Sequence, residues 1–134
     1  MRVHYEIANF LIASWRLATA GDKLPTSHGI LDRALERVQS DLPSRFRHEL
    51  TFSDTPIGRL CVQLPDILRA AQESYLTSDP NPTYKTAQVK IQPTTAMSLL
   101  DDLDIDIAAA TDFGERLAAE VKGEIASLHT HRAA

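Results

Sequence analysis

VHYEIANFLIASWRLATA, residues 3–20, is the stretch that decides the fold, because almost all of it is apolar or small. The polar side chains Arg2, Glu6, Asn9 and Arg16 fall on one narrow strip when the stretch is drawn as a helix. A helix that is apolar around most of its circumference has to be buried on several sides at once. We therefore predict that this helix is the centre of the core or part of a subunit interface. The residues that we assign to such an interface are Tyr5, Ile12 and Trp15.

The composition describes one soluble globular domain. The 134 residues are 43% hydrophobic and 24% charged, and a chain of this length buries a real core. No repeat, low-complexity tract or linker divides it, so we predict a single domain over residues 1–134. The net charge of −4 argues against a protein that binds nucleic acid with its whole surface. Cys61 is the single cysteine, which excludes an intrachain disulfide.

The start of the chain superficially resembles a signal peptide, with Arg2, an apolar run and the sequence ATA at residues 18–20. Glu6 and Arg16 interrupt that pattern, so we expect no signal peptide. No apolar run approaches the ~20 residues of a membrane-spanning helix. We therefore expect a cytoplasmic protein that makes no membrane contact.

Helical and alternating patterns follow one another after the first helix. Residues 29–42 have apolar side chains at helical spacing and end before Pro43, which predicts an amphipathic helix. From residue 45 to residue 53 apolar and polar side chains alternate, which predicts a half-buried strand. Residues 84–92 alternate in the same way, and we predict that these two strands pair.

Residues 57–64 fit two structures. After a turn at residues 53–56, Leu60, Val62 and Leu64 alternate like the second strand of a hairpin, and Pro65 then opens a helix over residues 66–76. The same residues also fit one face of a kinked helix over residues 55–77, in which Pro65 costs about 3 kcal/mol. We favour the hairpin, because a proline is tolerated at the first position of a helix.

The C-terminal third predicts two helices. Helical spacing runs from Ala96 to Ala110, although residues 103–107 alternate like a short strand. Asp112 and Glu115 have the spacing of a capping box that starts the last helix. The predicted fold class is helix-dominated α+β: two N-terminal helices, a small antiparallel sheet of two or three strands with an inserted helix, and two C-terminal helices. The alternative is a mainly α helical bundle.

No catalytic, metal or cofactor motif stands out. The run DLDID at residues 102–106 lacks the glycine and the glutamate that an EF-hand loop needs at its sixth and twelfth positions. His129 and His131 are fewer ligands than a zinc site requires. Cys61 lies in an apolar pattern, which is typical of an inert buried thiol. We find neither a nucleophile elbow nor a glycine-rich phosphate loop, so we assign no catalytic residue, no metal site and no cofactor.

Basic residues gather near the two strands that we predict to pair. The stretch from Asn81 to Leu100 has no acidic residue, and outward-facing cationic side chains on paired strands share one face. Such a face contacts phosphates, with a tyrosine available for stacking on bases. The residues of this candidate binding surface are Arg33, Arg37, Arg45, Arg47, Tyr84, Lys85 and Lys90.

Charge is distributed unevenly along the chain. Residues 94–134 hold eight acidic and three basic side chains, a net charge of −5, whereas residues 1–93 have a net charge of +1. A surface with separated charges steers association and sets the orientation of a partner.

These observations favour a non-enzymatic protein-interaction module, such as a small subunit, an adaptor, a chaperone or an inhibitor. We expect it to act through the apolar helix and the charge-asymmetric surface, on another protein or on a second copy of itself. The alternative is an accessory nucleic-acid-binding small subunit that uses the basic face. A third hypothesis is a small enzyme with an unrecognised site near a histidine such as His48.

Overall fold

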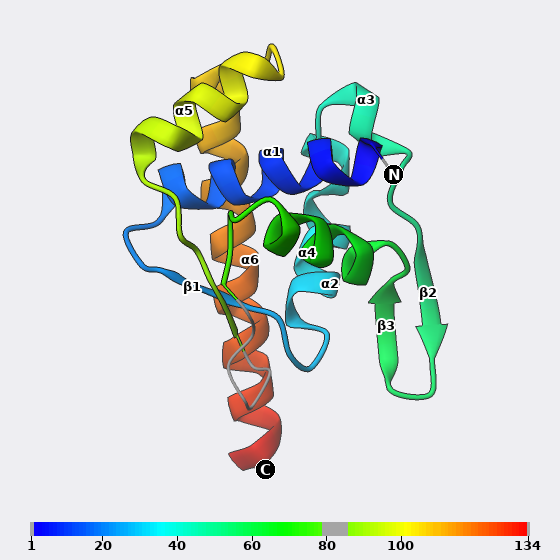
Figure 1. Cartoon of the computed structure of the whole chain (residues 1–134). Helices are drawn as coiled ribbons and strands as arrows, with labels where there is room; N and C mark the ends of the chain where they lie inside the picture. The colour runs from blue at the N-terminus through cyan, green and yellow to red at the C-terminus, as the bar shows by residue number, and fades with distance from the viewer. Residues whose placement is uncertain (1, 79–85, 134) are drawn as a thin grey trace.

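The computed structural model describes residues 2–78 and 86–133, with side chains as far as residue 128 (Figure 1). The described residues form six α-helices and two two-stranded antiparallel sheets. The predicted class, helix-dominated α+β, is therefore confirmed. None of the helices in this part of the chain is long and apolar enough to cross a membrane.

Helix α1 (Arg2–Ala18) runs through the middle of the protein, as its apolar sequence predicts (Figure 1). It packs against helices α4 (Leu64–Glu73), α5 (Pro93–Asp102) and α6 (Ile107–Ala133). At its centre the ring of Phe10 lies between those of Phe46 and Phe113, with centroid distances of 5.8 and 5.0 Å. Burial by three helices explains why so little of α1 is polar.

Helices α1 and α6 approach each other closely at Gly114. A Cβ atom built at this position lies 2.7 Å from the carbonyl carbon of Ser14 and 2.9 Å from the Cβ of Ala18. Ser14 is fully buried at this crossing. Glycine at residue 114 therefore allows the backbones of the two helices to pack together.

The helices at the middle of the chain begin and end close to where the sequence predicts. Helix α2 (Ile30–Val38) continues into a short 3-10 helix, η1 (Gln39–Asp41), and packs against α6. Helix α4 begins at Leu64 and carries Pro65 in its first turn. A residue in the first turn has no intrahelical use for its N–H group, so the prediction that Pro65 opens this helix is confirmed.

Strands β2 (Phe52–Thr55) and β3 (Gly58–Cys61) form a hairpin that projects from the helices (Figure 1). The prediction of a hairpin instead of a kinked helix is therefore confirmed, although the turn lies later in the chain than predicted. Thr55 pairs with Gly58, so the turn consists of Pro56 and Ile57 rather than of residues 53–56. The second strand accordingly ends at Cys61, before Val62 and Leu64.

The prediction of a strand over residues 45–53 is wrong for most of that range. Residues 44–47 form a short helix, α3 (Ser44–Arg47), and the strand begins only at Phe52. The alternation also fits a helical turn, because the buried side chains of Phe46 and Leu50 are four residues apart. Packing of Phe46 on Phe10 favours the helical form.

The predicted pairing of residues 84–92 with residues 45–53 is also wrong. Strand β4 (Thr86–Gln88) pairs antiparallel with strand β1 (Lys23–Pro25), with Leu24 opposite Ala87. The sequence around β1 resembles a turn, and its strand geometry depends on a partner that lies far along the chain. Residues 84 and 85 lie outside the described residues.

Two helices form the C-terminal third, as predicted, but the last one begins before Asp112. Asp106 Oδ2 accepts a hydrogen bond of 3.0 Å from the N–H group of Ala109, so Asp106 caps the N-terminus of α6. Asp112 lies inside that helix and pairs with Arg116 at 3.4 Å. The predicted capping box at Asp112 and Glu115 is therefore wrong.

Candidate functional site

Two residues of the predicted basic surface are paired with acidic side chains of α6. Arg33 Nε lies 2.6 Å from Glu124 Oε1, and Arg37 Nη2 lies 3.0 Å from Glu124 Oε2. Arg37 also lies 3.8 Å from Glu120. Glu124 is 7% exposed, whereas the side chains of Arg33 and Arg37 are 29% and 60% exposed, so these pairs join α2 to α6 at the edge of the core. Part of the charge asymmetry of the sequence is thus neutralised inside the fold.

Of the remaining basic residues, the ones that the structure describes, Arg45, Arg47 and Lys90, do not share a pair of strands. Arg45 donates a hydrogen bond of 2.7 Å to the carbonyl oxygen of Leu103 and lies over the ring of Phe46. Arg47 donates to the carbonyl oxygen of Leu42 at 3.1 Å. Lys90 is exposed and follows β4, where its N–H group donates to the carbonyl oxygen of Leu76, and Tyr84 and Lys85 lie outside the described residues. Because the two strands do not pair, the face that supported the nucleic-acid alternative is not formed.

The residues that we assigned to an interface on α1 are mostly internal. Ile12 is fully buried and Trp15 is 5% exposed, both within the protein's own core. Tyr5, at 38% exposed, is the member of this group that reaches the surface. The apolar circumference of α1 is therefore used by the chain's own helices.

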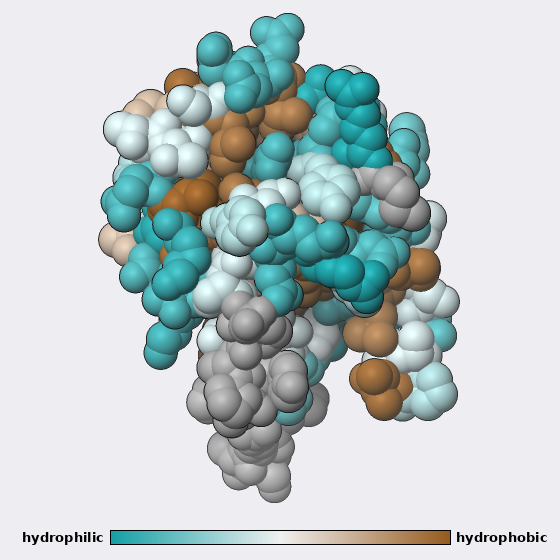
Figure 2. All heavy atoms as spheres, viewed as in Figure 1, coloured by the Kyte–Doolittle hydropathy of each residue, from teal (hydrophilic) through white to brown (hydrophobic). Residues whose placement is uncertain are grey.

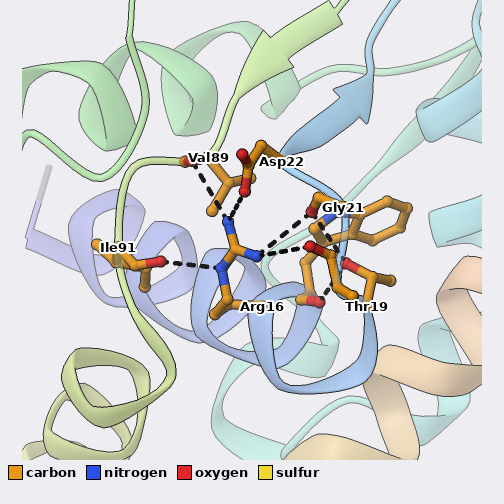
Figure 3. Close-up of polar contacts among 8 residues, drawn as sticks. Arg16, Thr19, Gly21, Asp22, Val89 and Ile91 are labelled. Atoms are coloured by element: carbon orange, nitrogen blue, oxygen red, sulfur yellow. Dashed lines mark hydrogen bonds and ion pairs between the residues drawn. The ribbon is translucent and has the colours of Figure 1, made fainter.

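Arg16 belongs to the polar strip of α1 but is buried, and its contacts are structural (Figure 3). Its Nε donates a hydrogen bond of 2.9 Å to the carbonyl oxygen of Ile91, and Nη2 donates to Asp22 Oδ1 at 2.7 Å and to the carbonyl oxygen of Val89 at 3.4 Å. The remaining nitrogen, Nη1, faces the carbonyl oxygens of Ala20 and Gly21. Arg16 thus connects the end of α1 to the segment after β4 and has no nitrogen left for a ligand.

Cys61, the single cysteine, is held in the core beside α2. Its backbone N–H group donates a hydrogen bond of 2.8 Å to Asp32 Oδ2, and its side chain is 2% exposed. Burial raises the pKa of the thiol from its ordinary value of 9.0 to about 11. A thiol in this state is a poor nucleophile near neutral pH.

We expect Cys61 in the folded protein to react with a soluble disulfide reagent far more slowly than the same residue in denaturant, at any pH below 9.0. Because the raised pKa favours the neutral thiol, its contribution to stability is complete below pH 9.0 and is lost as the pH rises towards about 11. Denaturation of the wild type and of Cys61→Ala across this range measures the loss as a difference. Equal labelling rates in folded and unfolded protein would contradict the burial of Cys61.

The histidines whose side chains the structure describes lie on separate elements. His48 is exposed just after α3. His4 lines a hollow of about 130 Å³ between α1 and α4, together with Tyr5, Asp66, Arg69, Ala70 and Glu73. Among the described residues no group of three or more histidine, cysteine or acidic side chains is placed to hold a metal ion. His129 and His131 lie beyond the side chains that the structure describes.

The turn between α5 and α6 forms an acidic hollow of about 460 Å³. Five residues line it, and we call them the acidic corner: Asp101, Asp104, Ile105, Asp106 and Ile107. Ile107 is 38% exposed, so the hollow offers apolar as well as acidic contacts. Figure 2 shows hydrophilic residues gathered at the end of the molecule where α5 leads into α6, with hydrophobic residues next to them.

Most of the negative charge at the acidic corner is not neutralised. Within the described residues, neither Asp101 nor Asp104 forms an ion pair. The nearby Arg45 donates to the carbonyl oxygen of Leu103 and lies 3.9 Å from Glu6. Asp101 also lies in the last turn of α5, where the carbonyl ends of a helix make a negative charge unfavourable. The carboxylates of Asp101 and Asp104 are therefore open to a cationic partner.

The acidic part of this site was visible in the sequence, but the hollow was not. Sequence reasoning recognised the acidic run at residues 102–106, rejected it as a calcium loop and treated it as a solvated face. Ile105 and Ile107 were assigned to a short alternating pattern, and their place beside the aspartates depends on the turn between α5 and α6.

Comparison with known proteins adds no relative from which a function could be transferred. No protein-family model matches the chain. Neither a curated protein nor a solved structure matches it.

Proposed function

We propose that the protein is a non-enzymatic interaction module, of the subunit or adaptor kind, that binds a basic segment of another protein at the acidic corner. The observation that carries this proposal is the hollow of about 460 Å³ in which aspartates without ion pairs among the described residues surround two isoleucines. The apolar circumference of α1, the surface first expected to act, is covered by α4, α5 and α6. The acidic corner is a part of the charge-asymmetric surface that no other described element covers.

The chemistry of the acidic corner selects a particular kind of partner. Arginine and lysine side chains form charge-assisted hydrogen bonds with carboxylates, and arginine does so in pairs. Ile105 and Ile107 add a contact that favours apolar residues next to those cations. A basic segment with interspersed apolar residues satisfies both requirements, whereas the phosphates of a nucleic acid are repelled.

We expect a fluorescent peptide of alternating lysine and leucine clusters to bind the wild type, and to bind about tenfold more weakly to the variant Asp101→Asn, Asp104→Asn, Asp106→Asn. Asparagine keeps the cap at residue 106 and tolerates the positive φ of 58° at residue 104. The change therefore removes charge with little effect on the backbone. Fluorescence anisotropy at low and at physiological salt measures both affinities, and the difference should shrink as salt screens the charges.

A matched variant separates the site from net charge. Glu49→Gln, Glu73→Gln, Glu115→Gln removes three exposed carboxylates that do not line the acidic corner, and we expect it to change affinity by less than about twofold. Equal weakening by both variants would mean that only net charge matters, and would refute the acidic corner as a site. A wild type that does not bind the lysine–leucine peptide would refute the proposal directly.

A further inference from the structure

Along β2 the backbone N–H and carbonyl groups of successive residues point alternately towards β3 and away from it. The edge of β2 that faces away from β3 is open. Val62 N–H donates a hydrogen bond of 2.9 Å to the carbonyl oxygen of Thr51, and the register pairs Ser53 with Leu60 and Thr55 with Gly58. In an antiparallel ladder every second residue bonds to the partner strand. Thr51, Ser53 and Thr55 therefore point their backbone groups at β3. Phe52 and Asp54 point theirs the opposite way.

The two edges of the hairpin differ in whether their outward backbone groups are hydrogen-bonded. The outward N–H group of Cys61, on β3, is bonded to Asp32 Oδ2 of α2. On β2, no described residue hydrogen-bonds to the backbone of Phe52 or Asp54. Figure 1 shows β2 as the outermost element on its side of the protein. An open edge of this kind is a template for another strand.

An exposed apolar side chain lies at the end of the open edge. Ile57, in the turn at the end of β2, is 84% exposed. Val62 is 57% exposed but follows β3, on the side of the hairpin away from the open edge. Hydrophobic spheres are visible at the end of the projecting hairpin in Figure 2. Contact of Ile57 with a strand added to β2 would add an apolar contribution to the hydrogen bonds of the edge.

We propose that β2 pairs with β2 of a second copy of this chain, antiparallel about a two-fold axis at Ser53, to form a four-stranded sheet. The open residues, Phe52 and Asp54, lie symmetrically on either side of Ser53. An axis at that residue brings Phe52 of each copy opposite Asp54 of the other, and each pair exchanges two N–H to carbonyl hydrogen bonds. The edge is therefore complementary to itself, which is the requirement of a two-fold interface.

Charge selects this register over its neighbours. An axis at Asp54 would bring the two Asp54 carboxylates opposite each other, a destabilising arrangement. An axis at Phe52 would pair Phe52 with Phe52 of the other copy, and this is one pair of open residues instead of two. With the axis at Ser53, Asp54 faces a phenylalanine and keeps its ion pair of 3.3 Å with Arg59. This surface is separate from the acidic corner, so either inference can fail alone.

Analytical ultracentrifugation over a wide concentration range tests the pairing. We expect a monomer–dimer equilibrium whose dissociation constant rises at least tenfold in Asp54→Pro, because proline removes the outward N–H group without breaking the β2–β3 ladder. Asp54→Ala loses the same carboxylate but keeps the N–H group, so it should dimerise like the wild type. A wild type that is monomeric at every concentration overturns the proposal, as does a dimer that Asp54→Pro leaves intact.

Cross-linking tests the position of the axis. In the proposed register the two Ser53 residues are opposite each other without being hydrogen-bonded to each other. The Cα atoms of such a pair are ~4.5 Å apart, a distance that a disulfide spans. We expect Ser53→Cys to form a covalent dimer with oxidised glutathione, whereas Thr55→Cys, which would face Thr51 of the other copy, should not. Equal cross-linking of both variants, or of neither, overturns this register.

Discussion

Gly114→Ala is expected to lower the free energy of unfolding by about 3 kcal/mol, because the added methyl group has no space. Its carbon would lie 2.7 Å from the carbonyl carbon of Ser14 and 2.9 Å from the Cβ of Ala18. Its nearest neighbour is the carbonyl oxygen of Ser14, a backbone atom that cannot rotate aside. Helices α1 and α6 would have to separate, and the melting temperature should fall by about 10 °C.

Gly123→Ala provides the control within the same helix. An added Cβ at residue 123 has no heavy atom within 4 Å, and alanine is a better helix former than glycine by about 1 kcal/mol. This variant should therefore be slightly more stable than the wild type. Calorimetry of both variants gives the comparison. A stabilising effect of both substitutions would contradict the close approach of α1 and α6.

The helices of this protein were predictable because the signals for a helix are local. Side chains three and four residues apart lie on one face, so the sequence of residues 29–42 predicts α2 without knowledge of the rest of the chain. Pro65 likewise marks the start of α4 through its own geometry. The close crossing at Gly114 has no such signal, because a glycine in a helix does not tell which helix it faces.

The strands were less predictable because each depends on a distant partner. Residues 46–52 alternate in polarity but also place two buried residues four apart, and the aromatic contact of Phe46 with Phe10 favours the helical form. Strand β1 has three residues, and it is a strand because it pairs with β4 more than 60 residues later. Neither partner can be read from the segment itself.

The candidate site was partly visible in the sequence for the same reasons. The aspartates at residues 102–106 are local, and their negative charge was recognised. The turn that brings Asp101 and Ile107 to one hollow is a tertiary feature. For the basic residues, the tertiary structure removed a predicted site. The sequence predicted Arg33 and Arg37 to contact a partner, but the fold pairs both with Glu124 of α6.

Arg16→Ala is expected to destabilise the protein by about 4 kcal/mol, mostly through acceptors that lose their donor. The guanidinium donates to the carbonyl oxygens of Ile91 and Val89, which belong to a largely buried segment. Water cannot easily replace it there, and the side chain leaves a cavity as well. The N–H group of Val89 bonds to the carbonyl oxygen of Asp22, so its hydrogen exchange should accelerate more than that of α2.

Arg116→Ala distinguishes the role of carbonyl acceptors from that of charge. Arg116 forms two ion pairs, with Asp41 at 3.2 Å and Asp112 at 3.4 Å, but its side chain is 56% exposed. Exposed pairs contribute little, so we expect a loss below about 1 kcal/mol. Arg16 forms one ion pair, with Asp22. Arg16→Ala should still lower the free energy of unfolding several times more than Arg116→Ala. Equal losses in the two variants would contradict this account, because the difference between them lies in the buried carbonyl oxygens and not in the number of charges paired.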